Sequence, residues 1–76
     1  MKPVADILQE IRPEFDFSTS VDYVGDGLLD SFDMLLLVAS LEKHYAISIP
    51  GIDIVPENFV NRGAIQSLLR THGVQL

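Results

Sequence analysis

The central feature of this sequence is residues 31–45, "SFDMLLLVASLEKHY", whose apolar positions predict a helix with two apolar faces. At about 100° per residue, one face carries Met34, Leu37, Val38, Leu41 and Tyr45, and the opposite face carries Phe32, Leu35, Leu36 and Ala39. The chain has only 76 residues, and a domain of this size cannot easily bury both sides of one helix. We expect the first face to lie in the core. The second is either covered by a loop or exposed for a partner.

A short helix is expected before this segment. Pro3 suits the first helical position, and Pro13 ends the helix because the residue before a proline avoids helical geometry. The apolar residues between them have helical spacing: Val4, Ile7, Leu8 and Ile11. Residues 13–30 then show no sustained period, which indicates a functional loop whose aromatic residues fold back onto the core.

The last third of the chain is less regular. Residues 46–56, "AISIPGIDIVP", could form a small hairpin. We favour an extended loop that packs its isoleucines into the core, because an isolated two-stranded ribbon is marginally stable. Pro56 opens a single turn that ends at Phe59, and a final helix starts near Asn61 and ends at Gly73. The residues that this final helix is expected to bury are Ile65, Leu68 and Leu69.

The sequence thus predicts a single all-α domain over residues 1–76. We expect a small antiparallel four-helix bundle, with three main helices plus one short helix and a long loop between helices one and two. The net charge of −6 argues against nucleic-acid binding and favours a partner with a basic surface. The absence of cysteine favours the cytoplasm, and the longest apolar run, residues 34–39, is too short to span a membrane.

Ser31 stands at the expected start of the main helix, after Asp30 as a plausible N-cap and before Asp33 as a short capping-box acid. Self-contained catalysis by this serine is not expected, because His44 lies roughly 20 Å further along the helix and His72 lies in a tail that we expect to be solvated. Two interpretations remain: a capping or first-turn serine with no further role, and a serine that is modified. A helix N-terminus would favour a phosphodiester there.

A calcium loop is a further alternative. Asp22, Asp26, Asp30 and Asp33 fall at positions 1, 5, 9 and 12 of an EF-hand-like segment, residues 22–33. Val24 stands at position 3 without a side-chain oxygen, and the preceding segment contains Pro13 and "DFSTS", which do not favour an entering helix. Both features weigh against a closed EF-hand.

The segment "GLLDSFDMLLLVASLEKHY", in the order of helices above, resembles the attachment site of acyl carrier proteins and related aminoacyl and peptidyl carriers. The resemblance covers nearly the whole chain, including "PENF" and "AIQSLL". It implies that the chain is not an enzyme. It also implies that 4′-phosphopantetheine from coenzyme A is attached to Ser31, with Asp30 as the preceding aspartate of the motif.

The same resemblance implies the partners of a monomeric carrier. These are a phosphopantetheinyl transferase, an adenylating acyl or aminoacyl ligase, and a downstream acyltransferase or condensing enzyme. The residues implied to meet them are Phe32, Asp33, Leu35, Leu36, Ala39 and Glu42. An unmodified helical adaptor that binds partners through the same apolar face of the helix is the alternative.

The chain departs from fatty-acid carriers at several positions. Phe32 replaces the usual leucine, Leu36 stands where an acid is common, and Lys43 interrupts the acidic cluster near the helix end. The glycine-rich approach of many peptidyl carriers is absent. The resemblance is therefore closer to free-standing carriers of one dedicated pathway, including the D-alanyl carrier type.

Overall fold

The computed structural model describes residues 2–76, and this part of the chain is all-helical. Its three α-helices are α1 (Val4–Ile11), α2 (Ser31–Tyr45) and α3 (Arg62–Thr71). Three short 3-10 turns lie in the connections: η1 (Phe17–Thr19), η2 (Gly51–Asp53) and η3 (Pro56–Phe59). Since residues 2–76 contain no strand, the hairpin alternative for residues 46–56 is wrong.

Prolines lie at both ends of α1, but Pro3 is the N-cap and not, as expected, the first helical residue. The Pro3 carbonyl accepts hydrogen bonds from the N–H groups of Asp6 and Ile7. At the other end, the Arg12 N–H donates to the Leu8 carbonyl at 3.0 Å, and Pro13 cannot continue the helix. The helix buries Val4, Ile7 and Leu8 against the rest of the core.

One face of α2 lies in the core, as the sequence predicted. Its buried apolar residues are Met34, Leu37, Val38, Leu41 and Tyr45. The helix ends where Ala46 adopts the left-handed conformation with φ 54°, and its N–H donates to the Glu42 carbonyl. A left-handed residue after the last turn reverses the chain direction and satisfies a terminal carbonyl.

The connection between α1 and α2, residues 12–30, packs its aromatic side chains onto the core, which confirms the expectation. Phe17 and Tyr23 are buried, with ring centroids 5.0 Å apart in an edge-to-face arrangement. The Tyr23 N–H donates to the Val60 carbonyl, which fixes this connection to the segment before α3. Not every apolar residue of the connection packs inward, because Val21 has 83% of its surface exposed.

The isoleucines of residues 46–56 do not all pack inward. Ile49 is buried, and Ile47 and Ile54 pack partly against the core, but Ile52 is 86% exposed. The 3-10 turn η2 places Ile52 on the surface, so the expectation that all four isoleucines enter the core is wrong at this residue.

Residues near the C-terminus complete the core. In η3, Phe59 is fully buried, and α3 buries Ile65, Leu68 and Leu69. The Asn61 side chain accepts a hydrogen bond from the Ala64 N–H at 2.8 Å and caps α3 as predicted. Gly73, with φ 88°, turns the chain after the helix.

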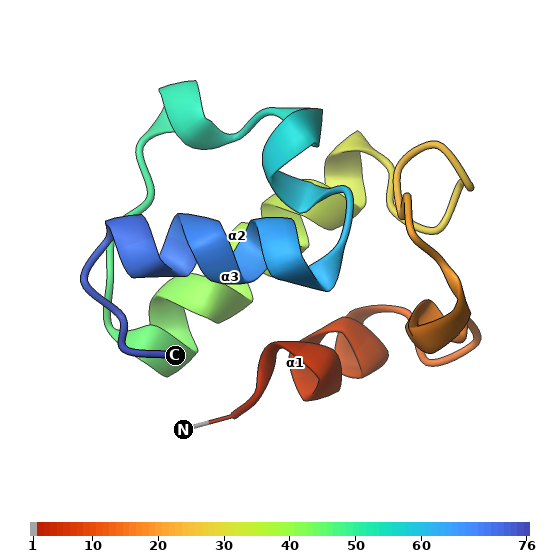
Figure 1. The fold of residues 1–76 in the computed structure, drawn as a ribbon, viewed down its shortest axis with the longest axis horizontal. Coiled ribbons are helices and arrows are strands. Elements are labelled where there is room, and N and C mark those ends of the chain that lie inside the picture. The colour runs from red at the N-terminus through yellow and green to blue at the C-terminus, as the bar shows by residue number, and fades with distance from the viewer. Residues whose placement is uncertain (1) are drawn as a thin grey trace.

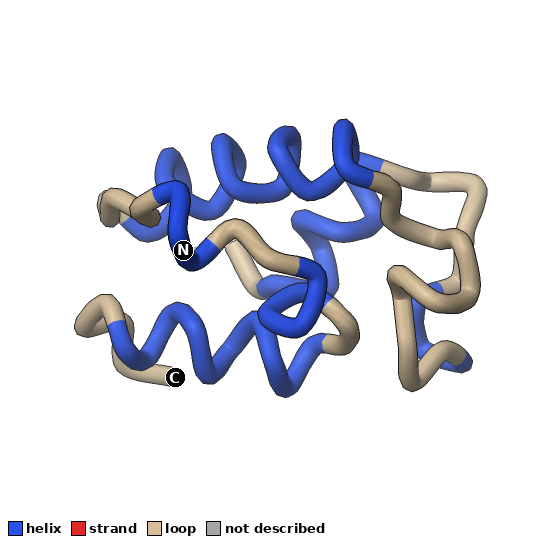
Figure 2. Tube along the Cα trace, turned by 90° about the horizontal axis from the view of Figure 1, so that it is seen from above, coloured by secondary structure: helices blue, strands red, loops and turns tan. Residues whose placement is uncertain are grey.

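The helices enclose one core, with α1 in contact with both α2 and α3. Figure 1 shows α1 running in the opposite direction to α2 and α3, while α2 and α3 run in the same direction. The connection of residues 12–30, orange to yellow in Figure 1, lies at one end of the molecule, and Figure 2 shows it at the same end from above. Among the described residues, no helix combines the length and apolar character needed to cross a membrane.

Candidate functional site

The first turn of α2 is held by a reciprocal capping box, as the sequence predicted. Asp30 is the N-cap, and its Oδ1 accepts a hydrogen bond from the Asp33 N–H at 2.9 Å. Asp33 Oδ2 in turn accepts from the Asp30 N–H at 3.1 Å. Two otherwise free backbone donors at the helix start are therefore satisfied by side chains from residues three apart.

Ser31 lies inside this box as the first residue of α2, and it is exposed. Within the described residues, its hydroxyl makes no hydrogen bond to another protein group. Of the two histidines, His44 lies near the far end of α2, and His72 Nε2 lies 3.2 Å from Asp53 Oδ2. The expectation that His72 is solvated is wrong, because it is part-buried against η2. Neither histidine is close to Ser31 along the chain, and Ser31 is accessible to another molecule.

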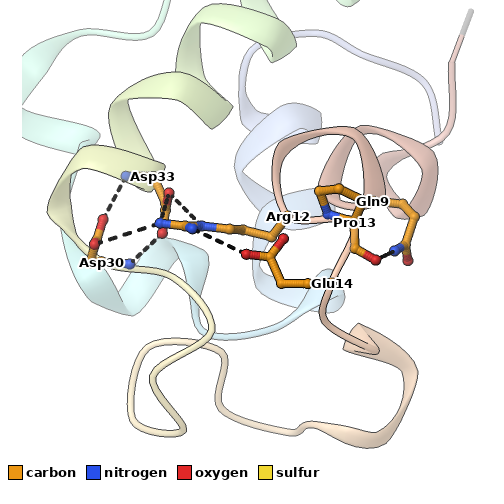
Figure 3. Close-up of polar contacts among 6 residues, drawn as sticks. All are labelled: Gln9, Arg12, Pro13, Glu14, Asp30 and Asp33. Atoms are coloured by element: carbon orange, nitrogen blue, oxygen red, sulfur yellow. Dashed lines mark hydrogen bonds and ion pairs between the residues drawn. The ribbon is translucent and has the colours of Figure 1, made fainter.

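An arginine from α1's end reaches this box, and sequence reasoning missed it. Arg12 Nε and Nη2 each lie 2.9 Å from Asp33 Oδ1, and Nη2 lies 3.9 Å from Asp30 Oδ2. Arg12 Nη1 lies 3.3 Å from Glu14 Oε2. Figure 3 shows the guanidinium extending from the end of α1 toward Asp30 and Asp33.

The turn that carries Arg12 is itself held in place. Gln9 Nε2 donates to the Pro13 carbonyl at 2.9 Å, as Figure 3 shows, and to the Phe15 carbonyl at 3.3 Å. These bonds hold the chain as it leaves α1. A helix-ending proline next to an arginine was the only local signal in the sequence, and it does not identify the carboxylate that the arginine binds.

Asp33 is buried, with only 3% of its surface exposed, although it was predicted to meet partners. Its side chain turns inward to complete the capping box and to bind Arg12, so its place on the partner face is a correction. Burial alone would raise the pKa of Asp33. Hydrogen bonds from the Arg12 guanidinium and the Asp30 N–H outweigh burial and hold the pKa of this carboxyl below its ordinary value.

The outer face of α2 is apolar and uncovered. Phe32 is 66% exposed, Leu35 56% and Leu36 42%, and Ala39 is also exposed. We call these four residues the exposed apolar patch. The loop alternative for this face is wrong, because residues 12–30 pack against the core and leave it open.

Glu42 was predicted to meet partners together with the patch, and its carboxylate has a structural role. It is partly buried, and its Oε2 accepts a hydrogen bond from the Ile49 N–H at 2.9 Å. The bond ties the end of α2 to the segment that follows. The exposed acid at the rim is therefore Asp30, which lies beside Ser31.

The four carboxylates of the EF-hand alternative do not converge. Asp22 Oδ1 accepts from the Gly25 N–H and Asp26 Oδ2 from the Ser20 hydroxyl, whereas Asp30 and Asp33 form the capping box. Residues 2–76 contain no group of three or more histidine or acidic side chains arranged to hold a metal ion. The geometry gives the EF-hand alternative no support.

A cavity of about 420 Å³ lies elsewhere, between α1, the η1 region and the start of α3. Its lining includes Leu8, Phe17, Tyr23 and Arg62, and it does not include Ser31. The cavity therefore does not belong to the start of α2.

The start of α2 combines an exposed serine, a satisfied helix cap and an adjoining exposed apolar patch. These features can present a hydroxyl to a modifying enzyme and an apolar surface to a partner. Comparisons of the chain with protein-family models, with curated proteins and with solved structures give no match.

Proposed function

We propose that this chain is an acyl or aminoacyl carrier of a dedicated biosynthetic pathway. Its cargo is held as a thioester on a 4′-phosphopantetheine arm attached to Ser31. The observation that carries the proposal is the exposed Ser31 hydroxyl at the first position of a capped helix, next to the exposed apolar patch. The resemblance of residues 27–45 to carrier attachment sites supports the same assignment.

The proposal includes the finer description of the fold. The chain is a monomeric, cytoplasmic four-helix carrier domain in which η3 serves as the short helix. Residues 12–30 are the long loop between the first two helices. The chain acts as a substrate of other enzymes and has no catalytic role of its own.

The residues at the start of α2 fit a phosphodiester. The N–H groups of the first two helical residues, Ser31 and Phe32, precede the capped Asp33 N–H and have no partner within the helix. Donors and partial positive charge at a helix N-terminus favour an attached phosphate. The exposed Asp30 carboxylate would repel the negative phosphate, and the positive Arg12 guanidinium beside it reduces that repulsion.

In the modification, the Ser31 Oγ forms a bond to the phosphorus that bears the pantetheine group of coenzyme A. The phosphoanhydride bond breaks, 3′,5′-ADP leaves, and a base of the transferase takes the hydroxyl proton. Once attached, the arm supplies the thiol that carries the acyl or aminoacyl group. The role of the chain is to present this serine without burying it.

The exposed apolar patch is proposed to meet the partner enzymes: the transferase, an adenylating ligase, and an acyltransferase or condensing enzyme. Phe32, Leu35 and Leu36 offer apolar area that a complementary pocket can bury. Leu36 in place of an acid favours a ligase with an apolar pocket over one with a basic surface.

The test is intact-mass measurement after incubation with coenzyme A and a promiscuous phosphopantetheinyl transferase. The wild type should gain one phosphopantetheinyl group, and Ser31→Ala should gain none. Modification of Ser31→Ala, or of Ser18, Ser20 or Ser40, would overturn the assignment.

A second candidate, an unmodified helical adaptor, is favoured by the same exposed apolar patch. It predicts that the wild type gains no mass under these conditions. The two functions therefore give opposite results in one experiment.

A further inference from the structure

Arg12 forms ion pairs with both carboxylates of the capping box that contains Ser31. Two of its nitrogens lie 2.9 Å from Asp33 Oδ1, and Nη2 lies 3.9 Å from Asp30 Oδ2. Figure 3 shows the guanidinium between the turn after α1 and the capping box. Within the described residues, no other lysine or arginine pairs with Asp30 or Asp33.

This contact links two helices at the base of a long connection. Arg12 precedes Asp33 by 21 residues, and the connection of residues 12–30 begins at Arg12 and ends next to the capping box. The bonds from Gln9 to the Pro13 and Phe15 carbonyls fix the side from which Arg12 extends. Ser31 is therefore held through the capping box relative to α1, and not only relative to its own helix.

The contact also changes the charge around the serine. The Asp30 side chain is 67% exposed and the Asp33 carboxylate is ionised, so both oppose a phosphate at Ser31. The Arg12 guanidinium, paired with the Asp33 carboxylate, offsets the negative charge of the two carboxylates. The attached phosphate would add a negative charge at the same place.

We propose that Arg12 is a positioning residue for the modification of Ser31: it fastens the capping box to the end of α1 and offsets the two carboxylates beside the serine. The inference rests on the proposed function. Arg12 acts through Asp33 and Asp30, and it needs no contact of its own with the transferase or with coenzyme A.

The experiment measures transfer kinetics on purified apo protein at a temperature where circular dichroism shows every variant folded. Arg12→Gln should lower kcat about three- to fivefold, with KM within about twofold of wild type, because charge placed at a helix start has modest energetic effects. Arg12→Lys should recover part of the rate, since it restores the charge and not the pair of nitrogens on Asp33 Oδ1. Arg70→Gln is the matched control, because Arg70 is an exposed arginine on α3 whose side chain bonds Ser67, and it should behave as wild type.

A double-mutant cycle identifies the route of the effect. Asp33→Asn keeps an oxygen that can accept the Asp30 N–H and removes the charge that Arg12 binds. In this background, Arg12→Gln should change kcat less than it does in the wild type. An undiminished effect, equal loss in Arg70→Gln, or wild-type kinetics in Arg12→Gln would each overturn the inference.

Amide NMR spectra separate this inference from the proposed function. Arg12→Gln should shift the signals of Ser31, Phe32 and Asp33, and Arg70→Gln should leave them in place. Unmodified wild type would overturn the proposed function and, with it, the role in modification. Normal modification of Arg12→Gln with unshifted amides would overturn the inference alone.

Discussion

The two faces of α2 are similar in sequence and different in environment. The inner face buries Leu37 and Leu41 completely, whereas Leu35 and Leu36, on the same helix, are 56% and 42% exposed. The difference is what lies opposite each face. α1 and the rest of the core cover the first, and residues 12–30 pack their aromatic rings elsewhere and leave the second open.

The comparison shows that apolar character alone does not decide burial. A chain of 76 residues supplies enough apolar residues to cover one side of its longest helix. The uncovered side is available for contacts with other molecules. Mutations on each face should therefore show whether the two faces differ in energy as they differ in exposure.

The largest expected effect is on the inner face. Leu41→Ala should lower the free energy of unfolding by about 2–5 kcal/mol, because truncating a fully buried leucine leaves a cavity. Urea denaturation followed by circular dichroism measures the change. Leu35→Ala is the matched control on the outer face, and a loss of the same size there would remove the distinction between the faces.

A smaller, pH-dependent effect is expected from Asp33, the charged residue among the buried side chains of the described chain. Its folded-state pKa lies below the ordinary value of 3.8, so its stabilising contribution is present above that value and is lost as the pH falls through the folded-state pKa.

Below pH 4 or so, wild type should therefore lose stability more steeply than Asp33→Asn. Thermal melts between neutral pH and pH 2 measure both slopes. Arg12→Gln should also show a shallower slope, since the hydrogen bond that lowers the pKa is then absent. Parallel curves for all three proteins would show that the ion pair adds no pH-dependent stability.

The smallest expected effect on stability is on the outer face. Leu36→Glu should change the free energy of unfolding by no more than about 0.5 kcal/mol, as is usual at exposed sites. It should nevertheless weaken loading by a dedicated ligase, because a charge would be desolvated against an apolar pocket. Melts and loading kinetics on one preparation measure both. Unfolding as severe as that of Leu41→Ala would mean that Leu36 belongs to the core.

Local sequence signals predicted the three helices, the N-caps of α2 and α3, and the end of α3. Asp30 with Asp33, Asn61 before α3 and Gly73 after it all have the predicted roles. Each role involves residues at most three or four positions apart, where chain geometry alone determines which groups meet. The position of Ser31 at the start of α2 was predictable for the same reason.

Only the tertiary structure decided which distant group reaches the capping box around that serine. The Arg12–Asp33 pair joins residues 21 positions apart, and its geometry depends on how α1 packs against α2. The same packing turned Asp33 inward and left Leu36 exposed. Ile52 lies on the surface because of the turn η2, although the sequence predicted that it would be buried like Ile49. Periodicity identifies the residues that can be buried, and contacts between distant segments decide which of them are.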